Sequence, residues 1–210
     1  MEDLKILLVN RKVVSETIVW LESIYSEMYS TCGKRHKYLA KSMDYSKIGK
    51  KNIFMEGYLR KVLYKFPEEI NVRVEMPAAT YLFEVRSGKE QVMLEELRVQ
   101  EFHHFISQLL FTFMICKKDI QTAVAFLMTW VRSPDEDDWK KLRHLPKYVK
   151  CTIRLLLILS ADNLNVLKWW VDASYAAHDH MRRHNGATLS MVRGLVLSIS
   201  KIKNDHKYLH

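Results

Sequence analysis

Cysteine is scarce in this sequence: its 210 residues include three, Cys32, Cys116 and Cys151, far apart and without a C-x-x-C pair. A disulfide framework would leave one of these cysteines over, so we expect no such framework. Free thiols of this kind are typical of proteins in a reducing compartment, where a cysteine serves as a small structural residue.

Long apolar runs and a leader sequence are also missing. The run at residues 155–159 is far shorter than the about 20 apolar residues that a membrane-spanning helix needs. The first residues contain no basic stretch followed by an apolar one, so we expect no signal peptide. These absences predict a soluble, cytoplasmic chain.

Apolar and charged residues are both plentiful. Hydrophobic residues make up 48% of the chain and charged residues 27%, which predicts a packed core and argues against global disorder. The length allows one domain of ordinary size or two small units. The formal net charge of +9 indicates either a polyanionic partner or ordinary solvated lysine-rich helix faces. Lysines that bind a polyanion release the counterions condensed on it, which favours binding.

Apolar spacing predicts a mixture of helices and strands. Apolar residues three or four apart indicate helices over residues 14–25, 55–66, 102–113 and 120–131. A short apolar run predicts a strand over residues 4–9. Two further runs around Ile48 and Gly49 predict a hairpin, over residues 38–45 and 51–55.

A fifth helix has a clear start signal. We expect Ser133 to cap it, Pro134 to take its first position, and Ser133 and Glu136 to form a capping box. Pro146 would then lie inside this helix, where a proline costs ~3 kcal/mol. On this interpretation Pro146→Leu stabilises the protein.

The pattern changes after residue 150. Residues 155–159, 167–173, 188–192 and 195–199 are short β-type runs, and we expect them to be consecutive antiparallel strands. A sheet needs a second layer over its apolar face, and no such layer follows in the sequence. We therefore expect an incomplete sheet.

Three groups of polar residues are candidates for chemistry. Glu2 and Asp3 form either a metal-binding carboxylate pair or a solvated terminus. Asp172 ends an apolar run and is either a hydrogen-bonded structural residue or a metal ligand. The histidines at 178, 180 and 184 have a spacing that allows zinc, but the basic surroundings favour a solvated loop.

Several stretches carry a resemblance when they are read in order. They are residues 2–6 (EDLKI), 38–46 (YLAKSMDYS), 102–111 (FHHFISQLLF), 119–127 (DIQTAVAFL), 134–142 (PDEDDWKKL), 171–176 (VDASYA) and 184–186 (HNG). In this order and spacing they resemble the copia-type retrotransposon polyprotein, where reverse transcriptase runs into ribonuclease H. The match is collinear over nearly the whole chain, which is more specific than any single motif.

The resemblance implies an α+β fold divided into four parts. These are a palm remnant with the start of the thumb (1–76), a linker (77–94), a helical thumb and connection (95–150), and a truncated ribonuclease H-like unit (151–210). It implies polymerase remnants at Glu2 and Asp3 and a ribonuclease H remnant at Asp172, with Mg²⁺ on Asp3 and Asp172 if the sites were completed. The partner would be an RNA–DNA hybrid or DNA duplex, bound weakly near the primer hairpin by Lys34, Arg35, Lys37, Tyr38 and Lys41.

The chain departs from the family pattern at several positions. Glu2 stands where the family has Asp, and Ala40 and Lys41 stand where it has Gly-Met. We expect a piece cut short at both ends, with no bound Mg²⁺ and no polymerase or ribonuclease H activity by itself, since two-ion catalysis needs several carboxylates. The alternatives are a non-catalytic nucleic-acid-binding module that keeps its primer–template contacts and an unrelated helical interaction protein.

Overall fold

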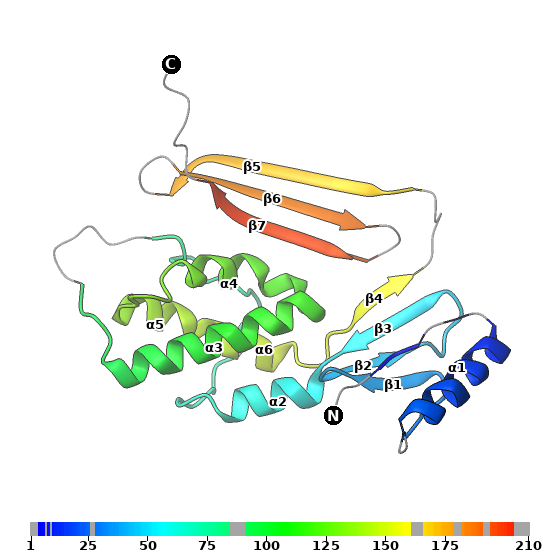
Figure 1. Ribbon diagram of the computed structural model, residues 1–210. Helices are drawn as coiled ribbons and strands as arrows, with labels where there is room; N and C mark the ends of the chain where they lie inside the picture. The colour runs from blue at the N-terminus through cyan, green and yellow to red at the C-terminus, as the bar shows by residue number, and fades with distance from the viewer. Residues whose placement is uncertain are drawn as a thin grey trace.

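A computed structural model describes residues 4–6, 8, 10–25, 28–84, 91–160, 166–178, 182–190 and 194–203. Two antiparallel sheets accompany a group of packed helices (Figure 1). The second sheet lies over α4 (Gln121–Met128), which contacts β7 (Leu197–Lys203). The fold is therefore of the predicted α+β class.

The first sheet has four antiparallel strands in the order β1-β2-β3-β4. They are β1 (Arg35–Tyr38), β2 (Lys41–Asp44), β3 (Lys50–Phe54) and β4 (Leu157–Ser160). Met43 lies opposite Ile53, and both are buried against the helices. The hairpin predicted around Ile48 and Gly49 is confirmed as β2–β3, but its first arm is shorter than the predicted 38–45, because Leu39 and Ala40 form the turn to β1. The expectation that residues 155–159 pair with the strands that follow is wrong, because β4 pairs with β3 instead.

The turn between β1 and β2 uses an unfavourable backbone conformation. Tyr38 lies opposite Lys41, so Leu39 and Ala40 form a two-residue loop, with φ values of 47° and 60°. Such loops match the twist of a hairpin when both central residues have positive φ, which glycine adopts freely and L-residues with a side chain do not. Ala40 is the position at which the resemblance places glycine.

Ala40→Gly is accordingly expected to raise the free energy of unfolding by about 0.5–1 kcal/mol. The relief of strain at φ 60° should exceed the greater entropy of glycine in the unfolded chain. Ala125→Gly in α4 is the matched control and should have the opposite sign, costing about 0.5–1 kcal/mol. Urea unfolding of both variants checks the pair, and a loss of stability at position 40 would contradict the account.

Among the described residues before α1 (Arg11–Ile24), residues 4–6 and 8 have no regular structure, where the sequence predicts a strand. The Lys5 side chain reaches across to Met43 and Tyr45. The predicted helix is confirmed, and the Asn10 side chain caps it by accepting from the Lys12 N–H at 3.0 Å.

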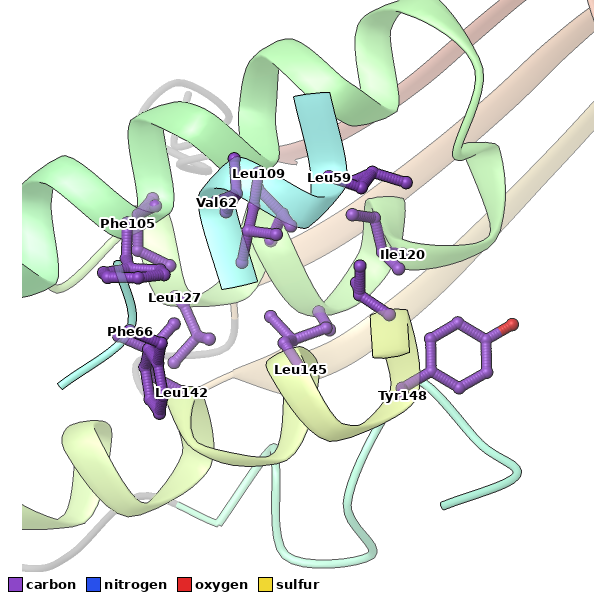
Figure 2. Packing of buried hydrophobic residues seen from close by; sticks show 14 of the residues in the cluster. Leu59, Val62, Phe66, Phe105, Leu109, Ile120, Leu127, Leu142, Leu145 and Tyr148 are labelled. Atoms are coloured by element: carbon purple, nitrogen blue, oxygen red, sulfur yellow. The ribbon is translucent and has the colours of Figure 1, made fainter. Parts of the chain in front are cut away.

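The main core lies between the helices. These are α2 (Glu56–Tyr64), α3 (Glu96–Ile115), the short 3₁₀ helix η1 (Lys118–Ile120), α4, α5 (Glu136–Leu142) and α6 (His144–Cys151). Figure 2 shows Leu59 and Val62 of α2 meeting Leu109 of α3, with Leu127 and Leu145 nearby. The helices that apolar spacing predicts at 55–66, 102–113 and 120–131 are confirmed.

Helix α5 begins two residues later than predicted. Asp135, not Ser133, is the N-cap: its side chain accepts from the Asp138 N–H at 2.8 Å, and the Asp138 side chain accepts from the Asp135 N–H at 3.1 Å. Aspartate caps a helix as effectively as serine, so a helix could begin at several positions in this acidic row. The Met93–Asp135 bridge keeps Asp135 in an extended conformation and selects this one.

Burial of this cap makes stability depend on pH. Burial raises the pKa of Asp138 to about 6, although the hydrogen bond from the Asp135 N–H opposes the rise. Because this pKa is higher folded than unfolded, the folded state takes up a proton, and stability is lost as pH rises from about 4 to about 6.

Asp138→Asn should therefore raise the free energy of unfolding at pH 7 by about 1–2 kcal/mol and change it little at pH 4. The asparagine keeps an oxygen that accepts from the Asp135 N–H and removes the buried charge. Asp138→Ala loses the acceptor as well and should show no such gain. Denaturation at both pH values checks this; an effect of Asp138→Asn that is equal at pH 4 and pH 7 would argue against it.

Pro146 does not interrupt a long helix. A proline ring clashes with the carbonyl four residues earlier, here that of Leu142, and α5 ends at this residue. Pro146 then occupies the first turn of α6, where no helical partner exists for the missing N–H. Leu142 and Leu145 are both buried on either side of the break. The expected stabilisation by Pro146→Leu therefore has no basis in this structure.

The second sheet has three antiparallel strands, β5 (Lys168–His178), β6 (Arg182–Ser190) and β7. The predicted runs at 167–173 and 195–199 overlap β5 and β7, and the run at 188–192 overlaps the end of β6 as far as Ser190. A Cβ on Gly194, whose φ is 110°, would lie 2.3 Å from the Ile158 carbonyl oxygen. This glycine lets the segment just before β7 approach β4. β7 itself contacts α4, so the second sheet does not stand alone.

Candidate nucleic-acid interface

The predicted binding residues lie on two different faces of the first sheet. Side chains alternate along a strand, so Tyr38 and the opposing Lys41 share the face of Met43, while Arg35 and Lys37 lie on the other face. Lys34 comes just before β1 and is exposed. The hairpin therefore brings Tyr38 and Lys41 together but separates them from Arg35 and Lys37.

Two lysines from outside the predicted set join Lys41 on the Met43 face. Lys51 lies two residues before Ile53 on β3 and so shares this face. Lys5 donates to the hydroxyl of Tyr45 at 2.9 Å, and its Nζ lies 3.0 Å from Sδ of Met43. Lys5 thus meets Met43, Tyr45 and Lys51, which lie 38, 40 and 46 positions further along the sequence.

Tyrosine rings hold the ammonium groups in position. Lys5 Nζ lies 5.0 Å and Lys51 Nζ 5.5 Å from the centre of the Tyr45 ring. Lys41 Nζ lies 5.5 Å from the centre of the Tyr38 ring. We call Lys5, Lys41 and Lys51, with these two tyrosines, the lysine cluster. Cation–π contacts of this kind orient the cations without neutralising them.

The electrostatics of the lysine cluster favour an anion. Partial burial lowers the pKa of Lys41, and the charges of Lys51 and Lys5 lower it further. Burial alone would raise the pKa of Tyr45, yet hydrogen bonds from Lys5 and Lys51 bring it below its usual value. Within the part of the chain that the structure describes, no carboxylate pairs with these three lysines. A bound phosphate would relieve their mutual repulsion.

The opposite face of the sheet is partly neutralised. Arg35 donates to Asp44 at 3.1 Å, in an ion pair across β1 and β2. Hydrogen bonds from Ser46 lower the pKa of Asp44, and Arg35 adds to this effect. Asp44 therefore stays ionised at neutral pH and offsets one of the cations on this face.

Of the three predicted catalytic residues, the structure describes Asp172 alone. Glu2 and Asp3 lie outside the described residues, as does His180. Asp172 is exposed on β5, opposite Gly186 of β6. Among the described residues, no three His, Cys, Asp or Glu side chains lie close enough to hold a metal ion. Asp172 by itself does not supply the several carboxylates that two-ion chemistry needs.

The sequence offers uneven signals for this site. Unbroken period-two alternation along residues 35–44 would place Arg35, Lys37 and Lys41 on one face. The two-residue turn at Leu39 and Ala40 puts Lys41 opposite Tyr38 instead and so separates it from the other two. Lys51 lies on β3 in the same hairpin as Lys41, so its proximity to Lys41 also has a local signal. The contact of Lys5 with Tyr45 joins residues 40 positions apart and has no local signal.

None of the helices that the structure describes has the length and apolarity needed to cross a membrane. Comparison with known proteins gives no relative for this chain: no protein-family model matches it, and neither a curated protein nor a solved structure does.

Proposed function

We propose that the chain is part of a copia-type reverse transcriptase and ribonuclease H, and that it binds RNA–DNA hybrid or DNA duplex weakly through the lysine cluster. The observation that carries the binding proposal is the convergence of Lys5, Lys41 and Lys51 around two tyrosines, without a carboxylate partner among the described residues. The family part rests on the collinear resemblance.

The chemistry of the lysine cluster is that of phosphate contact. Each ammonium group that neutralises a phosphate releases condensed counterions, which provides affinity independent of base sequence. Lys5, Lys41 and Lys51 are all half-buried, so their positions are more restricted than those of a solvated lysine. Three such contacts predict a slope of log affinity against log salt near −3 and dissociation constants of ~10⁻⁴–10⁻⁶ M at physiological salt.

Two features of the fold support the family part of the proposal. The resemblance places a primer-contacting hairpin at residues 38–46, and the strands β1 and β2 with their tight turn occupy this region. It also places Asp172 on an opening strand of a ribonuclease H sheet, and Asp172 lies on β5, the first strand of the second sheet. We propose binding without turnover, because Asp172 is the only acid that the resemblance implies for the ribonuclease H site and two-ion catalysis needs several carboxylates.

Fluorescence anisotropy with a labelled RNA–DNA hybrid and a DNA duplex of unrelated sequences tests the proposal. Between about 50 and 200 mM salt we expect equal affinity for all sequences and a slope near −3. The same samples with Mg²⁺ should show no primer extension or hybrid cleavage. Binding that ignores salt, or no binding at the lowest salt, would overturn the binding proposal; turnover abolished by Asp172→Asn would overturn the absence of catalysis.

A further inference from the structure

Strand β5 forms an edge of the second sheet. The strand order is β5-β6-β7, and β7 is the strand that contacts α4. Figure 1 shows β5 on the side of this sheet that faces away from the helices. An edge strand presents a row of backbone N–H and C=O groups that can pair with another strand. β5 spans Lys168–His178, long enough to serve as such a template.

The two faces of β5 carry different side chains. Trp169 and Val171 share a face with Leu197 and Ile199 of β7, since Trp169 lies opposite Leu189, which in turn lies opposite Leu197. Trp169 is 55% exposed and Val171 75%, which is unusual for large apolar side chains in a strand. Lys168, Trp170 and Asp172 alternate with them and lie on the other face.

This pattern is complementary to itself. We infer that β5 pairs antiparallel with β5 of a second copy of the chain, with the twofold axis at Trp170. Lys168 of each copy then lies opposite Asp172 of the other, and Trp170 lies opposite Trp170. On the second face Trp169 lies opposite Val171, and Leu167 opposite Ala173. Opposite charges and aromatic pairs facing each other across strands stabilise a sheet.

No other nearby register pairs the charges. A twofold axis at Trp169 would place Lys168 opposite Trp170, and one at Val171 would place Asp172 opposite Trp170. Moving the axis to Lys168 or to Asp172 would place like charges directly opposite, which is destabilising. The charge pattern therefore selects one register.

A second copy of the chain accounts for the exposed apolar side chains on one face of β5 and for the charge pattern on the other. Closed twofold pairing is the commonest form of association between identical chains, and it requires a surface that is complementary to itself. Pairing here would extend the second sheet continuously and bring the apolar patches of Trp169 and Val171 from the two copies side by side. The formal net charge of +9 opposes association, but salt at physiological concentration screens charges more than about 8 Å apart.

Sedimentation equilibrium on a charge-swap set tests the pairing. The wild-type chain should form dimers, and Lys168→Asp or Asp172→Lys should each weaken dimerisation by at least about tenfold, because each creates two like-charge pairs. The double variant Lys168→Asp/Asp172→Lys restores both opposite pairs and should recover most of the affinity. Lys65→Asp makes the same charge change on an exposed residue outside the sheet and should leave dimerisation unchanged.

Circular dichroism and unfolding midpoints show that each variant is folded. A wild-type chain that stays monomeric at its highest soluble concentration would overturn the inference. So would single variants that associate as strongly as wild type, or a folded double variant that fails to recover, since both results mean that Lys168 does not face Asp172.

Discussion

Replacing Lys117 by alanine is expected to lower the free energy of unfolding by about 3–5 kcal/mol. The side chain is 1% exposed, and its Nζ lies 2.9 Å from Oδ2 of Asp119 and 2.8 Å from Oγ1 of Thr152. The Tyr148 hydroxyl donates to the same Asp119 oxygen at 2.6 Å. This network joins the residues after α3 to α6, so it fixes two parts of the helical core.

Removal of the ammonium group leaves the other members without a cation. Asp119 keeps the Tyr148 hydroxyl as a donor, and its side chain is 26% exposed, so water compensates for part of the loss. Burial raises the pKa of Tyr148 to about 12, and the hydrogen bond to Asp119 contributes, so this phenol remains a neutral donor. The cost comes from the Asp119 carboxylate and the Thr152 hydroxyl, which are both half-buried and each lose one partner.

Two further variants separate charge from packing in this experiment. Lys117→Met keeps most of the apolar stem and should lose less stability than Lys117→Ala. Lys118→Ala removes a neighbouring lysine whose Nζ donates to the Met114 carbonyl at the surface, and its effect should be below about 1 kcal/mol. Urea unfolding measures all three variants. Equal losses for Lys117→Ala and Lys118→Ala would contradict a special role for the buried network.

Reversing the lysine cluster should have the largest effect on duplex binding. Lys5→Glu/Lys41→Glu/Lys51→Glu is expected to flatten the salt slope by about three contacts and to weaken binding at low salt on the order of a hundredfold. The corresponding change at Lys34, Arg35 and Lys37 should do less, because Asp44 already offsets Arg35. Both triple variants are measured by anisotropy on the same hybrid.

A third triple variant controls for net charge. Lys65→Glu/Arg73→Glu/Arg132→Glu makes the same total change at exposed positions outside the first sheet and should shift affinity least. If all three triple variants weaken binding equally, overall charge rather than the lysine cluster determines affinity. If the Lys34, Arg35 and Lys37 variant weakens binding most, the binding surface lies on the opposite face of the sheet.

The elements with strong local patterns could be predicted from the sequence. Helices α2 and α3 carry apolar residues three or four apart because each buries one face, and this spacing identified both. The β2–β3 hairpin follows from β-type runs on either side of Ile48 and Gly49. In each case the signal and the structure it predicts lie within about twenty residues, so local chemistry determines the outcome.

The remainder depends on contacts that a local pattern does not contain. The partner of β4 is β3, about a hundred positions earlier, rather than the next strand. Lys5 contacts Tyr45 only because folding brings the hairpin next to residue 5. Asp135 replaces Ser133 as the cap of α5 because residue 93 bridges to it, although both side chains can cap a helix. The same holds for Asp172, whose position on a sheet edge follows from the order of strands.

Lysine footprinting tests the central claim most directly. The chain is treated with an amine-acetylating reagent with and without saturating RNA–DNA hybrid at low salt, and each lysine is quantified by peptide mass spectrometry. The lowered pKa of Lys41 should make it react readily in the free chain. We predict that the hybrid protects Lys5, Lys41 and Lys51 while Lys65 reacts at an unchanged rate. Unchanged rates at the three clustered lysines, or protection confined to Lys34 and Lys37, would contradict the account.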